Sequence, residues 1–128
     1  MVYNKEPIQV LWDMVKDLKK KIPDIYKESM HEDENNVPAS YILLRSQISD
    51  DTETYGDGKS LIRSADCDII LVSKGYADDT TDLHNVNKKL IREHLKKQEI
   101  NFQEFNLGYD EGQKSTQHTF TLGVEYIG

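Results

Sequence analysis

Residues 61–74 read LIRSADCDIILVSK, and this stretch decides how the rest of the chain is arranged. Its apolar side chains are concentrated at residues 69–72, where Ile, Ile, Leu and Val follow one another. A short apolar run rich in β-branched residues is typical of a strand and too short for a helix. A second such run occupies residues 39–48. The segment between the two runs, residues 50–60, is rich in acidic residues and contains the turn sequence Gly-Asp-Gly. The two strands are therefore predicted to form a long antiparallel β-hairpin with an acidic tip.

Apolar residues recur at helical spacing on both sides of this predicted hairpin. Upstream, residues 8–22 place an apolar side chain every three or four positions, which makes one helical face apolar. Pro7 suits the first turn of such a helix, and Pro23 prevents its continuation. Downstream, residues 78–82 offer N-caps for a second amphipathic helix that ends near Gln98. Its apolar stripe consists of Leu83, Val86, Leu90, Ile91 and Leu95.

The C-terminal residues 119–126 read TFTLGVEY, with a large apolar side chain at every second position. This period predicts a strand with one buried face. A shorter strand is expected to begin at Ile100 and Phe102, before a turn within residues 107–115. The predicted fold class is α+β, with a mostly antiparallel sheet, a long β-hairpin and two amphipathic helices packed on one face. No repeat or linker divides the sequence, so residues 1–128 are predicted to form a single domain.

The charge balance excludes several classes of protein. The 23 acidic residues outnumber the 16 basic ones, for a net charge of −7, which opposes a sequence-independent grip on nucleic acid. No apolar run approaches the roughly 18 residues of a membrane span, and residues 1–21 lack the apolar block of a signal peptide. We therefore expect a protein that is made and kept in the cytosol. Its single cysteine, Cys67, excludes an internal disulfide.

The sequence offers little catalytic or metal-binding chemistry. Of the four histidines, His84 and His94 are ten positions apart, which is not the spacing of a two-histidine metal site on a helix. Cys67 lies between Asp66 and Asp68, whose charges would raise the pKa of its thiol and oppose thiolate formation. We therefore expect a non-enzymatic protein with no catalytic residue, no cofactor and no metal ligand.

Two enzymatic alternatives are weak. Some Mg-dependent nucleases place an aspartate on one strand and a Glu-x-Lys triplet on the next; here Asp68 and Lys74 are present, but Val72 stands where the second carboxylate should be. The Gly-Lys-Ser triplet at residues 58–60 lacks the first glycine of a phosphate-binding loop, because Glu53 stands at that position. A polar turn is the simpler interpretation.

The order of these features resembles the tail terminator and head–tail joining proteins of long-tailed bacteriophages and prophages, also called tail completion or neck proteins. The resemblance covers nearly the whole chain as a pattern, although Gly56 and Gln117 depart from it and leave open which of these rings the protein would form. The residues that carry it are Tyr55 with Asp57 before the second hairpin strand, the strand 68–74 (DIILVSK), the turn Tyr109-Asp110-Glu111, and His118 two residues before Phe120.

This resemblance implies a structural virion protein at the head–tail interface. The copies would form a ring, usually a hexamer, that terminates or completes the tail, and a monomer is the alternative state of the free subunit. The implied partners are further copies of the chain, the tail tube protein and the head connector or stopper protein. DNA would pass through the channel without specific binding, no membrane is involved, and the protein would reside in the host cytoplasm before assembly.

Two acidic segments are the candidate functional residues. The first is an assembly or channel loop of Asp50, Asp51, Glu53, Tyr55 and Asp57, for which a solvated hairpin tip is the equally weighted alternative. The second is a mobile loop that contains His31, Glu32, Asp33 and Glu34. An alternative function is a small acidic prophage or host adaptor that binds another protein by mimicking the charge of nucleic acid.

Overall fold

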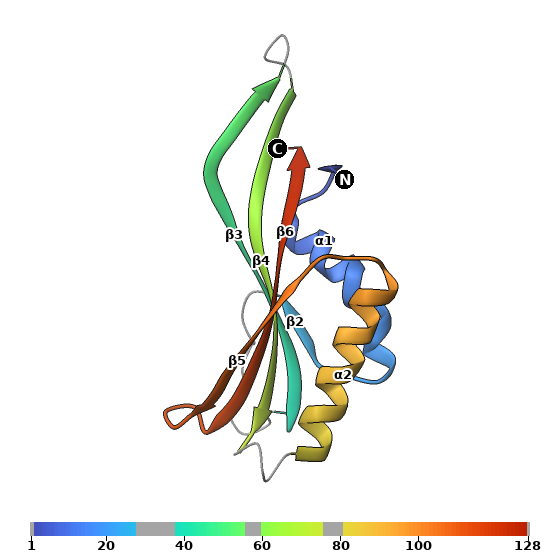
Figure 1. Ribbon diagram of the computed structural model, residues 1–128, viewed down its shortest axis with the longest axis vertical. Coiled ribbons are helices and arrows are strands. Elements are labelled where there is room, and N and C mark those ends of the chain that lie inside the picture. The colour runs from blue at the N-terminus through green and yellow to red at the C-terminus, as the bar shows by residue number, and fades with distance from the viewer. Residues whose placement is uncertain (1, 28–37, 56–59, 76–80, 128) are drawn as a thin grey trace.

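The computed structural model describes residues 2–27, 38–55, 60–75 and 81–127 (Figure 1). Two helices and a short 3₁₀ helix accompany a sheet that forms most of the molecule. The elements are β1 (Val2–Tyr3), α1 (Pro7–Val15), the 3₁₀ helix η1 (Lys16–Lys20), β2 (Ile25–Lys27), β3 (Ser40–Tyr55), β4 (Ser60–Lys74), α2 (Thr81–Lys97), β5 (Gln103–Asp110) and β6 (Ser115–Ile127).

The sheet is mixed rather than purely antiparallel. Its strand order is β1-β6-β4-β3-β2, and β5 also pairs with β6. The long neighbours β3, β4, β6 and β5 are antiparallel, whereas β1 is parallel to β6 and β2 is parallel to β3. The two parallel strands flank the α1–η1 segment and add a short strand to either side of the sheet. Strands of two and three residues have no period that a sequence pattern could reveal.

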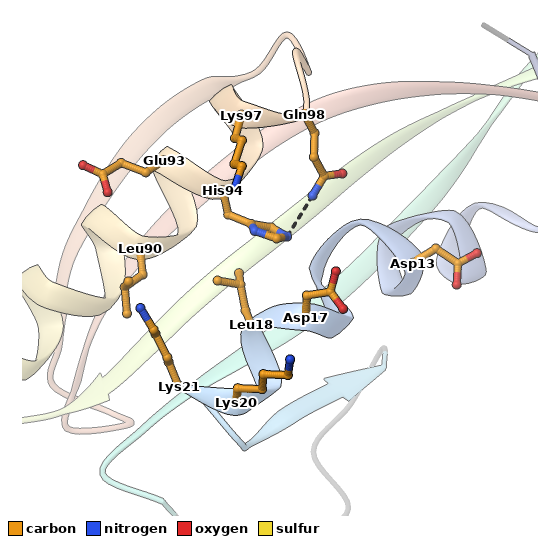
Figure 2. Close-up of a pocket in the computed structure, with 10 residues that line it drawn as sticks. All are labelled: Asp13, Asp17, Leu18, Lys20, Lys21, Leu90, Glu93, His94, Lys97 and Gln98. Carbon is orange, nitrogen blue, oxygen red and sulfur yellow. Dashed lines mark hydrogen bonds between the residues drawn. The ribbon is translucent and has the colours of Figure 1, made fainter.

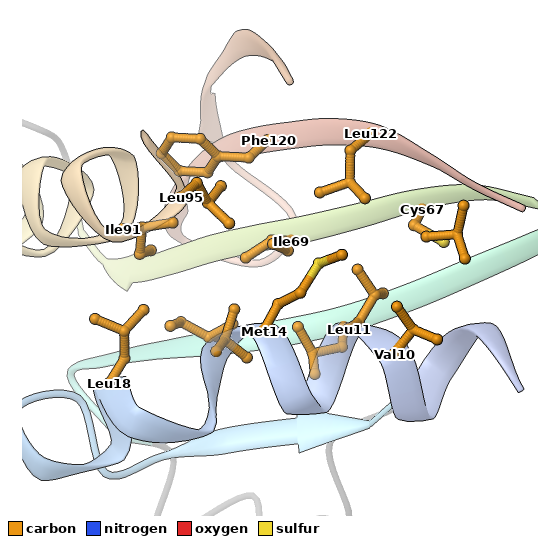
Figure 3. Packing of buried hydrophobic residues seen from close by; sticks show 14 of the residues in the cluster. Val10, Leu11, Met14, Leu18, Cys67, Ile69, Ile91, Leu95, Phe120 and Leu122 are labelled. Atoms are coloured by element: carbon orange, nitrogen blue, oxygen red, sulfur yellow. The ribbon is translucent and has the colours of Figure 1, made fainter. Parts of the chain in front are cut away.

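Both helices pack on one face of the sheet, as predicted (Figure 1). Their buried side chains interlock with those of the central strands and of β6 in one hydrophobic core (Figure 3). Phe120 on β6 is fully buried there and its ring lies 5.8 Å from that of Phe102. The helices supply Val10, Leu11, Met14, Val15, Leu18, Ile91 and Leu95, and the strands supply Ile42, Leu44, Ala65, Cys67, Ile69, Leu71, Phe120, Leu122, Val124 and Tyr126.

The N-terminal helix is shorter than predicted. The α-helix starts at Pro7 and ends at Val15, and the chain then tightens into η1. Leu18 and Ile22 remain buried, so the predicted apolar face is correct although the helix type changes. Two side chains from the end of α2 and the residue that follows it contact the end of α1: His94 Nε2 lies 2.8 Å from the Met14 carbonyl oxygen, and Gln98 Nε2 donates to the same oxygen.

The acidic segment predicted as a hairpin tip is largely strand. β3 continues through Tyr55 and is antiparallel to β4 from Ser60, with a register irregularity between Ile48 and Thr52. Thr52, Thr54 and Tyr55 favour extended backbone, and this preference outweighs the acidic composition. The connecting residues 56–59 lie outside the described residues, so the hairpin itself stays a prediction.

The other face of the sheet divides into an apolar end and a polar middle. At the apolar end, Leu43, Ile70 and Val72 form a second small cluster with Tyr26 and Tyr41. The two tyrosine rings meet edge to face with centroids 5.7 Å apart. We call this side of the sheet the open face, because α1 and α2 both lie on the other side.

Candidate functional site

Strand β5 is an edge strand that exposes large apolar side chains. Among the described strands, only β6 pairs with it, so residues 103–107 present an outer backbone edge. Phe105 is 49% exposed and Leu107 is 59% exposed, and we call these two residues the β5 patch. An exposed apolar edge strand is a site for association with another chain, because its backbone groups and side chains both lack partners within the sheet.

The other side of β5 is fixed by an ionic hydrogen-bond network. Glu104 accepts hydrogen bonds of 2.8 to 3.0 Å from the guanidinium of Arg92 on α2, and His118 Nε2 on β6 lies 2.9 Å from the same carboxylate. The hydrogen bonds from Arg92 are the main reason that the pKa of Glu104 is lowered. Side chains alternate along a strand, so the anchoring of Glu104 towards α2 turns Phe105 to the open face.

Local turn chemistry shapes the far end of β5. The register shifts between Asn106 and Gly108, which places Leu107 in a β-bulge. Gly108 has a φ of +71°, a conformation that suits glycine, and its N–H donates to Asn106 Oδ1 at 3.0 Å. In the following turn, Asp110 Oδ1 accepts a 2.8 Å hydrogen bond from the Gly112 N–H. The β5 patch therefore sits on backbone that is held by specific contacts.

Helix α2 carries a second exposed apolar pair. Leu83 is 45% exposed and Val86 is 55% exposed, and we call these residues the α2 patch. The predicted apolar stripe of this helix is thus wrong at its start, since Ile91 and Leu95 are buried but Leu83 and Val86 are not. The buried face begins instead with the polar residues His84 and Asn87, which are 3% and 4% exposed. Because His84 and Asn87 are polar, the spacing of apolar residues does not reveal that they begin the buried face.

A chain of hydrogen bonds satisfies the buried polar groups beneath α2. Asn87 Nδ2 donates to Ser40 Oγ at 3.0 Å, Ser40 Oγ lies 3.0 Å from Ser73 Oγ, and Ser73 Oγ lies 2.7 Å from His84 Nδ1. If each hydroxyl donates to the next group, His84 Nδ1 is the acceptor and the ring is neutral. Ser73 is fully buried, so this serine–histidine pair cannot reach a substrate, and its role is to hold α2 on β3 and β4.

Glu104→Gln should destabilise the fold by about 1–2 kcal/mol, because a neutral amide loses the charge-assisted hydrogen bonds from Arg92 and His118. Urea denaturation monitored by circular dichroism measures this change. Glu111→Gln is the matched control, since Glu111 is exposed in the neighbouring turn and should change stability by less than about 0.5 kcal/mol. Equal stability of the two variants would show that the network does not hold β5 in place.

A groove of about 800 Å³ lies between the two helical segments (Figure 2). Leu18 and Leu90 form part of its apolar lining, and His94 and Gln98 are hydrogen-bonded to each other there. Its charged lining residues are of both signs: Asp13, Asp17 and Glu93, with Lys20, Lys21 and Lys97. These charges do not converge on one point in Figure 2, and the polar groups of His94 and Gln98 already contact α1.

The polar middle of the open face is mostly acidic. Asp66 and Asp68 on β4 alternate with the buried Cys67 and therefore point away from the helices, as Glu125 on β6 does. Asp68 accepts a 2.9 Å hydrogen bond from Thr121, and Arg45 is its cross-strand neighbour. This acidic row is not apparent from the sequence, because its members come from two strands that are far apart in the chain.

In the part of the chain that the structure describes, neither Cys67 nor the acidic and histidine side chains form a nucleophilic or metal-binding site. Burial is the main cause that raises the pKa of the Cys67 thiol to about 12, and Asp68 and Asp66 add to it, so the thiol stays protonated at neutral pH. Within the described ranges, no group of three or more His, Cys, Asp or Glu side chains is placed to hold a metal ion.

The two predicted acidic segments are placed only in part. Asp50, Asp51, Glu53 and Tyr55 lie on the backbone of β3, which corrects their assignment to a loop. Asp57 lies outside the described residues, as does the second predicted loop with His31, Glu32, Asp33 and Glu34.

No helix among the described residues is long and apolar enough to cross a membrane. Comparison of the chain with protein-family models, with curated proteins and with solved structures finds no match. What the protein does must therefore be inferred from its own residues and surfaces.

Proposed function

We propose that this chain is a structural virion protein of a tailed bacteriophage that forms a ring at the head–tail interface. The ring either terminates the tail or joins it to the head connector, and DNA passes through its centre. The observation that carries the proposal is the β5 patch, an apolar edge strand that is exposed yet held rigidly by Glu104. The proposal also draws on the resemblance in the order of sequence features.

An exposed edge strand suits a subunit whose partner is another copy of the same chain. A ring of identical copies uses one surface of each subunit against a different surface of its neighbour, and the contact closes on itself. The polar contacts of α2 and β5 keep these surfaces in a fixed geometry before assembly, which reduces the entropy lost on association.

The acidic row of the open face supports a wall that does not retain DNA. Asp66, Asp68 and Glu125 would repel phosphates within a Debye length of about 8 Å at physiological ionic strength. The helical layer is less suited to this role, because the α1–η1 segment and α2 carry clustered lysines. We assign the acidic middle of the open face, rather than its β5 edge, to the channel.

A phage with a stop codon in this gene should produce separate heads and tails. Addition of the purified protein should join them into infectious particles. In a lysate of the mutant phage, added protein is expected to raise the number of infectious particles by at least about tenfold, because joining is the missing step. Plaque counts measure infectivity, and electron microscopy shows rings at one end of the tails. Bovine serum albumin, another acidic protein, is the control.

Normal virions from the mutant phage would refute this function, as would a wild-type protein that neither binds isolated tails nor restores infectivity. A charge-mimicking adaptor would give that second outcome. Binding of the purified protein to isolated tails and its restoration of infectivity therefore decide between the two functions.

A further inference from the structure

We propose that neighbouring copies bind head to tail, with the β5 patch of one copy packed against the α2 patch of the next. The contact thus joins Phe105 and Leu107 to Leu83 and Val86 of a second copy of this chain. It rests on the proposed function, since it specifies how the ring would be built. Both pairs are exposed in the single chain, and Phe105 supplies a large aromatic side chain to the contact.

The two patches face in different directions, as a head-to-tail contact requires. Arg92 on α2 and Glu104 on β5 are bonded to each other on the inner side of both elements. Successive helical residues rotate by about 100°, so Leu83 lies about half a turn around the helix from Arg92. Phe105 points away from Glu104 because it is the next residue on the strand. One copy can therefore offer both patches at once, to two different neighbours.

The positions of the patches favour a closed ring over an open filament. Figure 1 shows β5 and α2, which meet at the Arg92–Glu104 pair, diverging towards opposite sides of the molecule in the half away from the end where β3 finishes and β4 begins. A contact between surfaces at the same level along the long axis relates neighbours by rotation with little shift along that axis. Repeated rotation without translation can close into a ring, whereas rotation combined with translation along the axis would produce an open helical filament of subunits.

Charge complementarity favours a second copy as the occupant of each patch. Arg92 and Glu104 already pair within one copy. Apart from them, helix α2 has four basic residues against two acidic ones, and the segment 103–117 around the β5 patch has two acidic residues against one basic. Lys89, whose Nζ also lies 4.0 Å from Glu93 Oε1, is exposed close to Val86, and Asp110 and Glu111 are exposed close to Leu107. Opposite charges around two apolar patches favour their mutual approach and disfavour contacts of either patch with itself.

The size of the patches predicts a weak single contact. Full burial of one Leu or Phe side chain contributes about 1.5–3 kcal/mol, and these side chains are already half buried. Most of this gain is offset by the entropy lost on association. A closed ring gives every copy two contacts, so the ring can be stable although a free pair dissociates.

Chemical cross-linking can capture such a weak contact. Val86→Cys and Leu107→Cys place thiols in the two patches, while the native Cys67 is buried and unreactive. With a short bismaleimide, the double variant should form a ladder that ends at a closed ring. A mixture of the two single variants should stop at a dimer, and each single variant alone should stay monomeric. A double variant with Lys16→Cys and Glu125→Cys, both exposed and outside the patches, controls for random collision.

If the Leu107→Cys variant alone formed cross-linked dimers in the same yield as the mixture of the two single variants, the proposal would be overturned, because the contact would then be symmetric. A ladder no stronger than that of the control pair would also overturn it. The phage assay separates this inference from the function on which it rests. Val86→Asp and Leu107→Asp should lower the restored infectivity at least about tenfold; full restoration by both would leave the function standing and remove this interface. If the wild-type protein fails there, the function falls instead.

Discussion

Replacing Phe120 by alanine should lower the free energy of unfolding by about 3–5 kcal/mol, the usual cost of removing a buried aromatic side chain. Phe120 is fully buried between the sheet and the helices. Its ring lies 5.8 Å from the ring of Phe102 and 5.0 Å from that of His118. No neighbour can fill the resulting space without leaving its own contacts, so the loss includes a cavity as well as the lost apolar burial.

Equilibrium unfolding in urea measures this change as a shift of the midpoint at constant slope. The matched control is Phe105→Ala, the same substitution on the neighbouring strand at a half-exposed site. It should cost less than about 1 kcal/mol, because most of the lost surface was already in water. Similar losses for the two variants would contradict the assignment of Phe120 to the core and of Phe105 to the surface.

Much of the fold could be predicted from the apolar pattern, because alternation marks a strand buried on one face and a continuous apolar run marks a strand buried on both. The alternation of residues 119–126 and the apolar run of residues 69–72 both lie in central strands, where their buried positions match the pattern. The parallel strands β1 and β2 could not be predicted, since their few residues join the sheet only through tertiary contacts. The 3₁₀ segment η1 was missed because it buries the same face that an α-helix would have buried there.

The candidate interface was harder to predict, since exposure depends on neighbours that are distant in sequence. Phe105 and Leu83 resemble core residues in a list of apolar positions. Only the pairing of β5 with β6, and the burial of His84 in place of Leu83, turn them outwards. The acidic segment of residues 50–55 was assigned to a loop by composition, although its threonines and tyrosine favour a strand.

Acidification below about pH 6.5 should destabilise the protein, because two buried histidines are held neutral in the fold. Burial is the main cause that lowers the pKa of both His84 and His118, and the nearby Lys88 lowers both further. Glu104 acts in the opposite direction on His118 without reversing the net shift. Protonated His118 would also carry an Nδ1–H for which the described residues offer no acceptor.

The sign follows from proton linkage. A histidine whose pKa is lower in the folded state than in the unfolded state contributes fully above about pH 6.5, its ordinary value, and the contribution falls as the pH drops towards the folded pKa. In that window each histidine takes up as much as one proton on unfolding. The stability should therefore fall by up to about 1.4 kcal/mol per pH unit for each histidine, or about 2.7 for both.

Urea denaturation at a series of pH values tests this slope. His84→Gln and His118→Gln should each remove about half of the slope, and the double variant nearly all of it, because an amide does not titrate in this range. The carboxylates Asp13 and Glu104 have lowered pKa values, so their contributions are lost only in more acidic solution and do not overlap with the histidines. If the free energy of unfolding of the double variant still fell with pH at the same slope, protonation of His84 and His118 would not be the cause of the pH dependence.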